Sequence, residues 1–296
     1  MKYVITGSLG NISQPLTKKL VSAGHNVTVV SSQESRKAEI EALGAKAAIG
    51  SVQDLAFLTE TFTGADAAYI MVPPTFSATN WKAYIGDTGK IYAQAIKAAG
   101  LKHIVNLSSI GAHMPEGCGP VSGLHFEETA LNTLTDVHIK HLRPGNFFTN
   151  LYTNIGMIKH NGIIGANYGN NTTIIFAYPA DIADVAAEEL LTLSFKNHSI
   201  RYVVSDERTT SEVAKVLGTA IGKPELPWID FTDADSYAGM TGAGLPEEVA
   251  KNYVEMGKAL REGTMFADYN THKASVKKSK TKLEEFAKEF AAAYNK

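Results

Sequence analysis

The sequence predicts an α/β protein: a doubly wound parallel sheet with a smaller α+β lobe at its C-terminal side. Two observations lead to this prediction. The N-terminal half of the 296-residue chain alternates short apolar or β-branched runs with longer helical patterns, which is typical of parallel strands joined by right-handed crossovers. The chain also opens with a short apolar strand, Tyr3 to Thr6, that leads directly into a glycine turn. Its length suits one main domain with a dependent lobe.

Six apolar or β-branched runs are predicted to form the strands of this sheet, and helical patterns separate them. Ser51, followed three residues later by Asp54, resembles the start of a helix, and Leu55, Leu58 and Phe62 then share one helix face. The predicted strands are Tyr3 to Thr6, Asn26 to Ser31, Ala45 to Ile49, Ala67 to Val72, His103 to Leu107 and Val137 to Leu142.

The regular alternation ends after residue 145, where we expect the smaller lobe to begin. A helix over about 181–193, a strand near 201–204 and a helix over about 210–221 follow with less regular spacing. The last predicted helix carries an apolar stripe that either packs on the body of the protein or binds a partner. We divide the chain into a main domain, residues 1–150, and a lobe, residues 151–296, partly interleaved with it. The stripe consists of Leu283, Phe286 and Phe290.

The composition excludes several classes of function. A formal net charge of −2, with 20% charged residues, argues against nucleic acid or an anionic membrane surface as the main partner, so small-molecule ligands are expected. The one cysteine, Cys118, excludes an intrachain disulfide framework, and no leader or long apolar run stands out. These features predict a cytoplasmic protein. A homodimer is compatible with them.

The glycine turn predicts a dinucleotide-binding site. Gly7 and Gly10 let the backbone turn tightly, and the helix that follows would aim free N–H groups at a pyrophosphate. The spacing is G-x-x-G-x-x-S, so Ser13 stands where a third glycine is expected. The alternative is a structural turn without a ligand. The residues predicted to bind the cofactor here are Gly7, Ser8, Leu9, Gly10, Asn11 and Ile12.

The tip of the second strand favours NADP(H) over NAD(H). A carboxylate at this place would bind the ribose 2′-hydroxyl, but the sequence gives Ser31 and Ser32, with Arg36 shortly after. Two hydroxyls and a guanidinium suit a 2′-phosphate. In the alternative interpretation, Arg36 is an exposed charge at the start of a helix.

Two further strand ends are expected to line the same crevice, because ligands of open α/β sheets lie beyond the carboxyl ends of the strands. Met71 and Val72 end the fourth strand, and Pro73 and Pro74 follow it and would form a rigid wall beside the cofactor and its substrate. Ser108 follows the fifth strand and would orient the nicotinamide end. Each could instead belong to ordinary loop structure.

The motifs TGSLGNIS, SSIG, RPGNFFTN and YPADIADVAAEEL together resemble the NmrA-like family of atypical short-chain dehydrogenase/reductases, in this order over nearly the whole chain. The resemblance implies a Rossmann-type domain that binds NAD(P) and a C-terminal lobe that closes over the cleft. The family includes NAD(P)H-dependent quinone reductases and redox-sensing regulators that do not catalyse a reaction.

The sequence departs from standard short-chain dehydrogenases, which use a Tyr-x-x-x-Lys pair after the fifth strand. No tyrosine occurs between Ser108 and Arg143, and the only lysine there is Lys140. An aliphatic alkoxide needs a positioned proton donor, whereas the product of hydride addition to a quinone is a phenolate, with a pKa of roughly 10. His125 is the candidate helper donor, similar in position to a histidine of related quinone reductases. The alternative is a structural histidine bonded to backbone.

An apolar wall for a planar acceptor is predicted from Phe147 and Phe148, with Pro73 and His125 completing the substrate site. Both phenylalanines could instead be core. No metal is expected, because His138 and His141 fall on opposite faces of a strand.

Two functions follow from these residues. The first is an NAD(P)H-dependent oxidoreductase, preferring NADPH, that transfers hydride to a quinone-like or other conjugated small molecule. The second is an NAD(P)-binding redox sensor that acts through a protein partner. Rapid oxidation of NADPH by a simple quinone selects the first.

Overall fold

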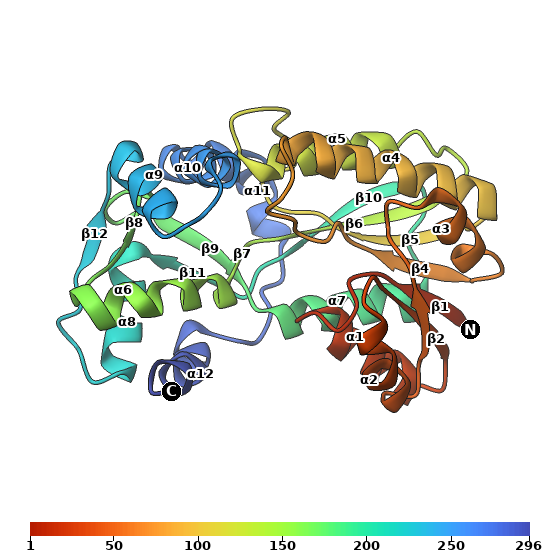
Figure 1. Cartoon of the computed structure of the whole chain (residues 1–296), viewed down its shortest axis with the longest axis horizontal. Coiled ribbons are helices and arrows are strands. Elements are labelled where there is room, and N and C mark those ends of the chain that lie inside the picture. Colours follow the sequence, from red (N-terminus) through yellow and green to blue (C-terminus); the bar gives the residue numbers. More distant parts are fainter.

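A seven-stranded parallel sheet forms the centre of the main domain (Figure 1). The computed structural model describes residues 1–296, and every pairing within this sheet is parallel. The strand order is β10-β6-β5-β4-β1-β2-β3, so the winding reverses between β1 and β4. This confirms the doubly wound, Rossmann-type class. The strands are β1 Lys2–Ile5, β2 Asn26–Ser31, β3 Lys46–Ile49, β4 Ala67–Ile70, β5 His103–Leu107, β6 His138–Pro144 and β10 His198–Val203.

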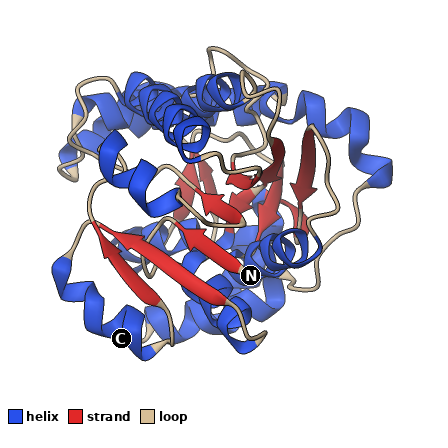
Figure 2. Cartoon of the chain, turned by 90° about the vertical axis from the view of Figure 1, so that its right-hand side faces the viewer, coloured by secondary structure: helices blue, strands red, loops and turns tan.

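Helices cover both faces of the sheet, as Figures 1 and 2 show. Alternate residues of β1 divide between the two layers: Tyr3 and Ile5 belong to the core under one layer, and Val4 belongs to the core under the other. The first layer is α1 Ser13–Ser22, α2 Lys37–Ala42 and α7 Pro179–Thr192; the second is α3 Leu55–Phe62, α4 Trp81–Ala99 and α5 Pro120–Leu131.

A further core of 25 buried residues lies around two small sheets of the second lobe, and it also includes Ile110, Ala112, Cys118, Val121 and Phe148 of residues 1–150. The sheets are β11-β9-β7 and β12-β8. Their strands are β7 Asn146–Phe147, β8 Ile164–Ala166, β9 Thr173–Ala177, β11 Asp206–Thr209 and β12 Trp228–Asp230. The helices are α6 Ile155–Asn161, α8 Thr210–Ala220, α9 Asp233–Gly242, α10 Glu247–Glu262, α11 Ala267–His272 and α12 Leu283–Tyr294, with short 3₁₀ segments η2 Phe148–Asn154, η3 Thr264–Phe266 and η4 Lys273–Ser275. One further 3₁₀ segment, η1 Glu34–Arg36, precedes α2 in the main domain. No helix is long and apolar enough to cross a membrane.

Two local expectations can be compared directly with the structure. The apolar stripe of α12, residues 283, 286 and 290, is fully buried in the core of the second lobe, so it packs on the body of the protein. The start of α3 differs from the prediction, because Asp54 itself caps the helix by accepting the Phe57 N–H at 3.1 Å. Ser51 instead accepts from Gln53 within the preceding turn.

The two parts of the chain are interleaved through α7 and β10, which come from residues beyond 150 but complete the main sheet and one of its layers. The strand expected near residues 201–204 is thus an edge strand of the main sheet rather than part of the lobe. Asp181, at the start of α7, joins the crossing segments: its carboxylate accepts from Ser205 Oγ at 2.7 Å and from Thr281 Oγ1 at 3.0 Å. The Ser279 N–H donates to the Val204 carbonyl at 2.7 Å.

Candidate functional site

The turn between β1 and α1 leaves backbone donors free at the start of a helix. Gly7 has φ +88°, and the Gly10 N–H closes the turn on the Gly7 carbonyl at 3.1 Å. The N–H groups of residues 11–13 donate to no other group of the protein, and no side chain caps the helix. Unpaired N–H groups and the positive end of the helix dipole together attract an anion.

The same turn is shaped for a close approach by a ligand. A Cβ atom on Gly7 would lie 3.0 Å from the Met71 Sδ, and its positive φ disfavours any side chain. Ser13 fits the third glycine position because its buried hydroxyl donates to the Thr6 carbonyl at 2.8 Å. The residues present therefore fit a dinucleotide pyrophosphate.

The predicted adenosine end contains one buried and one exposed hydroxyl. Ser31 is buried, and its Oγ accepts from Ser8 Oγ at 3.0 Å and from the Gln33 N–H at 3.2 Å. Ser32 is exposed. Ser31 therefore holds the glycine turn against the tip of β2, and Ser32 offers the free hydroxyl.

Arg36 lies in η1 with about half of its side chain exposed. Its Nη1 pairs with Glu39 Oε2 at 3.0 Å. An exposed pair of this kind contributes only about 0–1 kcal/mol, so a phosphate dianion can compete for the guanidinium.

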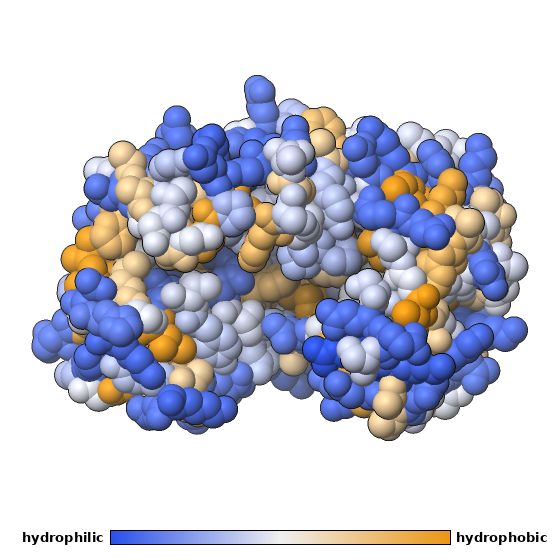
Figure 3. Space-filling view, viewed as in Figure 1, coloured by the Kyte–Doolittle hydropathy of each residue, from blue (hydrophilic) through white to orange (hydrophobic).

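Three of the predicted site residues lie on the same side of the sheet. Leu9, Met71 and Phe147 are partly buried and pack against the same core cluster. Met71 is fixed from beneath, because its N–H donates to Thr6 Oγ1 at 2.9 Å and its carbonyl accepts from Tyr92 at 2.7 Å. Val72 and Pro73 follow, also partly exposed. Figure 3 shows the surface hollowed between the two lobes, with apolar side chains in the hollow.

Two predicted contacts are corrected by the structure. Ser108 is 4% exposed, and its hydroxyl donates to Glu128 Oε1 at 2.5 Å, so it points toward α5 rather than toward a ligand. Phe148 is fully buried in the core of the second lobe, stacked between Phe176 and Phe286 at centroid distances of 5.0 and 5.3 Å. Phe147 is thus the one available for an apolar wall.

His125 is half-buried on α5. Its Nδ1 lies 3.0 Å from the Ala112 carbonyl, an arrangement that makes Nδ1 the donor. This bond leaves Nε2 available. The Ala112 carbonyl is thus the backbone partner expected of a histidine with only a structural role. The bond occupies one ring nitrogen, so the other can still contact a substrate.

A buried polar network next to this helix was not expected from the sequence. Burial would raise the pKa of Glu128, but hydrogen bonds from Arg143 outweigh it and lower the pKa. Glu127 is fully buried, and burial raises the pKa of its carboxyl well above the usual range. Glu128 stands at helical spacing from Leu124 and Leu131 on the sheet side of α5. This spacing is the sequence signal from which the burial of Glu128 could have been predicted.

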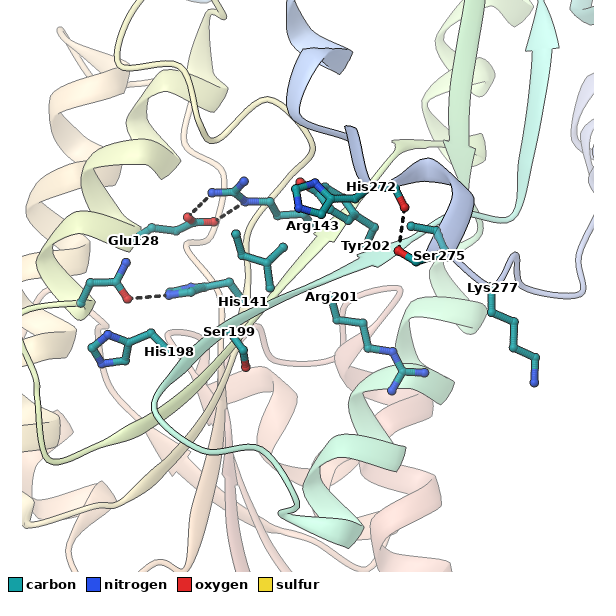
Figure 4. A pocket seen from close by; sticks show the side chains of 13 residues that line it. Glu128, His141, Arg143, His198, Ser199, Arg201, Tyr202, His272, Ser275 and Lys277 are labelled. Carbon is teal, nitrogen blue, oxygen red and sulfur yellow. Dashed lines mark hydrogen bonds and ion pairs between the residues drawn. The ribbon is translucent and has the colours of Figure 1, made fainter. Parts of the chain in front are cut away.

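A cavity of about 690 Å³ lies elsewhere, along the free edge of β10 (Figure 4). Both arginines that line it are already paired: Arg143 with Glu128 of the same lining at 2.6 Å, and Arg201 with Glu188 and Glu189 of α7 at 2.8 Å each. His141, which lines it, is buried, and burial lowers its pKa to about 4.

Burial raises the pKa of Cys118 to about 12, so that thiol is unreactive at neutral pH.

Comparisons with known proteins agree with this geometry. The family described as NAD(P)H-binding matches residues 7–137. An NAD(P)H azoreductase of Xenophilus azovorans is 23% identical over 293 residues, 98% of each chain. The NADPH complex of an Escherichia coli NADPH-dependent quinone oxidoreductase superposes with a TM-score of 0.83 at 20% identity, covering 97% of this chain and 99% of the other. A Citrobacter triphenylmethane reductase gives 0.81 at 18% identity, covering 99% and 100%.

Proposed function

Since residues 7–137 form an NAD(P)H-binding domain of the NmrA-like, atypical short-chain dehydrogenase/reductase type, we propose that this protein is an NADPH-dependent oxidoreductase acting on a quinone-like or dye acceptor. The observation that carries the proposal is the uncapped start of α1 beside the Gly7 turn, at the point where the strand order reverses. The single, unpaired Cys118 fits a reducing compartment, so we place the protein in the cytoplasm.

The N–H groups of residues 11–13 would bind the pyrophosphate, and the Ser32 hydroxyl with Arg36 would bind the 2′-phosphate. No carboxylate stands at the tip of β2, where one would repel that phosphate. The E. coli quinone oxidoreductase was solved with NADPH, which supports the same preference here.

The acceptor is proposed from the proton chemistry that the site can support. When bound, the reduced nicotinamide supplies a hydride, two electrons and one proton, to the acceptor. A quinone then carries a phenolate-like oxygen. Water can protonate it, or the doubly protonated form of His125, in which Nε2 also carries a proton while Nδ1 keeps its bond to Ala112. Met71 and Phe147 supply the apolar wall against which a planar ring would lie. The azoreductase and triphenylmethane reductase relatives also have conjugated acceptors by name.

The test is a panel of acceptors with the purified protein. We expect NADPH to be oxidised, measured by loss of its absorbance, with a simple quinone, an azo dye and a triphenylmethane dye. An aliphatic ketone is the negative control, since the Tyr-x-x-x-Lys pair with which standard short-chain dehydrogenases act on such ketones is absent. Tight binding that distinguishes NADP⁺ from NADPH, without turnover across the panel, would instead establish the redox sensor.

A further inference from the structure

A chain of buried polar contacts runs from the end of β5 to α5 and then to the end of β6. Glu128 is its centre: Oε1 accepts from Ser108 at 2.5 Å and from Arg143 Nε at 3.0 Å. Arg143 Nη2 donates to Oε2 at 2.6 Å, which makes the pair bidentate. The side chains of Glu128 and Arg143 are each 7% exposed.

The chain continues into the second lobe. Arg143 Nη1 donates to Asp268 Oδ2 at 2.7 Å, and Asp268, on α11, also accepts from Tyr202 of the edge strand β10. Asp268 is 125 residues from Arg143 in sequence. Figure 4 shows Glu128 and Arg143 joined beside Tyr202 and the segment that follows α11. One guanidinium therefore links a helix of the main domain to a helix of the lobe.

The other end of the chain reaches the candidate active site through a loop. Residues 108–113 leave the sheet beside the end of β4, because Ile70 pairs with Asn106 in register. The Ser108 and Ile110 N–H groups donate to carbonyls at the end of β6, at 2.8 and 2.9 Å. The same loop supplies the Ala112 carbonyl that holds His125. The position of this loop thus determines the orientation of the candidate proton donor.

A network of this kind is not explained by stability alone. Taking charges out of water costs several kcal/mol per ion, so a buried ion pair is weak grounds for stability and can be retained for the geometry it imposes. Here the geometry joins the lobe, the loop and His125.

We propose that Glu128 is a positioning residue: with Arg143 it transmits the position of α11 to Ser108, and so to the loop that orients His125 toward the acceptor. This inference rests on the proposed function. Glu128 itself does not touch the acceptor, and the reaction it serves is the transfer of a proton from His125.

The test is a double-mutant cycle on the two ends of the chain, Ser108→Ala and Asp268→Asn, which keep both buried ions of the central pair. The readouts are the single-turnover rate of quinone reduction at saturating NADPH and the Kd of NADPH. We expect each single variant to lower the rate with little change in Kd, and the double variant to be no slower than the slower single one. If the two residues acted independently, their fold losses in rate would multiply. We expect the double variant to be about tenfold faster than that product predicts, and this difference is the coupling between the two residues. Multiplicative losses would overturn the proposal.

A second readout does not depend on turnover. Hydrogen exchange of the amides of residues 108–113 is expected to accelerate in Asp268→Asn. The control is Asp233→Asn, which breaks another ion pair of the second lobe, to Arg261 at 2.9 Å, with neither residue bonded to the Glu128 network. Unchanged exchange in Asp268→Asn would overturn the inference. If the wild-type protein fails to reduce any acceptor, the proposed function fails, while the exchange experiment still decides whether the network positions the loop.

Discussion

The hydroxyl of Ser13 lies 2.6 Å from the place that a Cβ atom on Gly7 would take. The two residues therefore fix each other: the serine can occupy the third glycine position only because the first position carries no side chain. Strand and helix remain close together, and the turn keeps its N–H groups toward the ligand side.

Gly7→Ala should accordingly lose more stability than the same change at Gly24. Both glycines have positive φ, +88° and +82°, and an alanine there costs about 1–2 kcal/mol. A Cβ at Gly24 meets nothing within 4 Å, so the collision with Ser13 at Gly7 adds about 1–3 kcal/mol. Denaturant unfolding measures the difference, and NADPH binding should fail only in Gly7→Ala. Equal losses of stability at both positions would show that a Cβ atom on Gly7 does not collide with Ser13.

Arg36→Ala should weaken NADPH binding by about 10- to 100-fold, since a charge-assisted hydrogen bond is worth about 1.5–3 kcal/mol. NADH binding should hardly change. Glu39→Gln is the matched control, because it frees Arg36 from its partner at 3.0 Å and should leave NADPH binding equal or tighter. Titration of the wild-type protein and both variants with each coenzyme gives the dissociation constants. Equal losses for NADPH and NADH in Arg36→Ala would remove the residue from the 2′-phosphate site.

His125→Ala should slow quinone reduction by about 10²-fold, the lower range for a general acid. A cationic triphenylmethane dye provides an internal control, because a carbocation that accepts hydride needs no proton and should be reduced at the wild-type rate. Steady-state kinetics with both acceptors measures the two rates. A parallel fall with both acceptors would mean that His125 shapes the site rather than donating a proton.

Glu127→Gln should stabilise the protein most at neutral and alkaline pH. Burial keeps Glu127 protonated in the fold, whereas the unfolded chain loses this proton above a pKa of about 4.3. The folded state then binds more protons than the unfolded state, so the free energy of unfolding falls as pH rises from there toward the raised pKa. Glutamine is neutral in both states and removes this dependence. Unfolding measured across pH should show the two proteins converging in acid; a constant difference would contradict the assignment.

Local pattern was sufficient to predict the main sheet. The six predicted strands lie within about two residues of those observed, because apolar runs and glycine turns report burial and chain reversal directly. The glycine turn was predictable for the same reason: its chemistry lies within thirteen consecutive residues.

The rest depended on contacts between distant segments. Nothing near residue 200 shows that its strand joins the main sheet beside β6, and nothing near Phe148 distinguishes a core ring from a cleft ring. The Glu128 network needs Asp268, from a helix late in the chain. Ser108 has the residue type and position expected of a cofactor contact, but an unexpected neighbour on α5 takes its hydroxyl.

The passage of the chain through β10 and α7 also limits how this protein can be cut. A fragment ending at residue 150 would lack an edge strand and the helix that packs on α1, and the Tyr3 hydroxyl would lose its acceptor, the Leu190 carbonyl at 2.9 Å. A fragment beginning at residue 151 would carry that strand and helix without a sheet to receive them. Gene fusions and split reporters based on this chain should therefore attach at its ends, since a break near the apparent lobe boundary would leave two incomplete pieces.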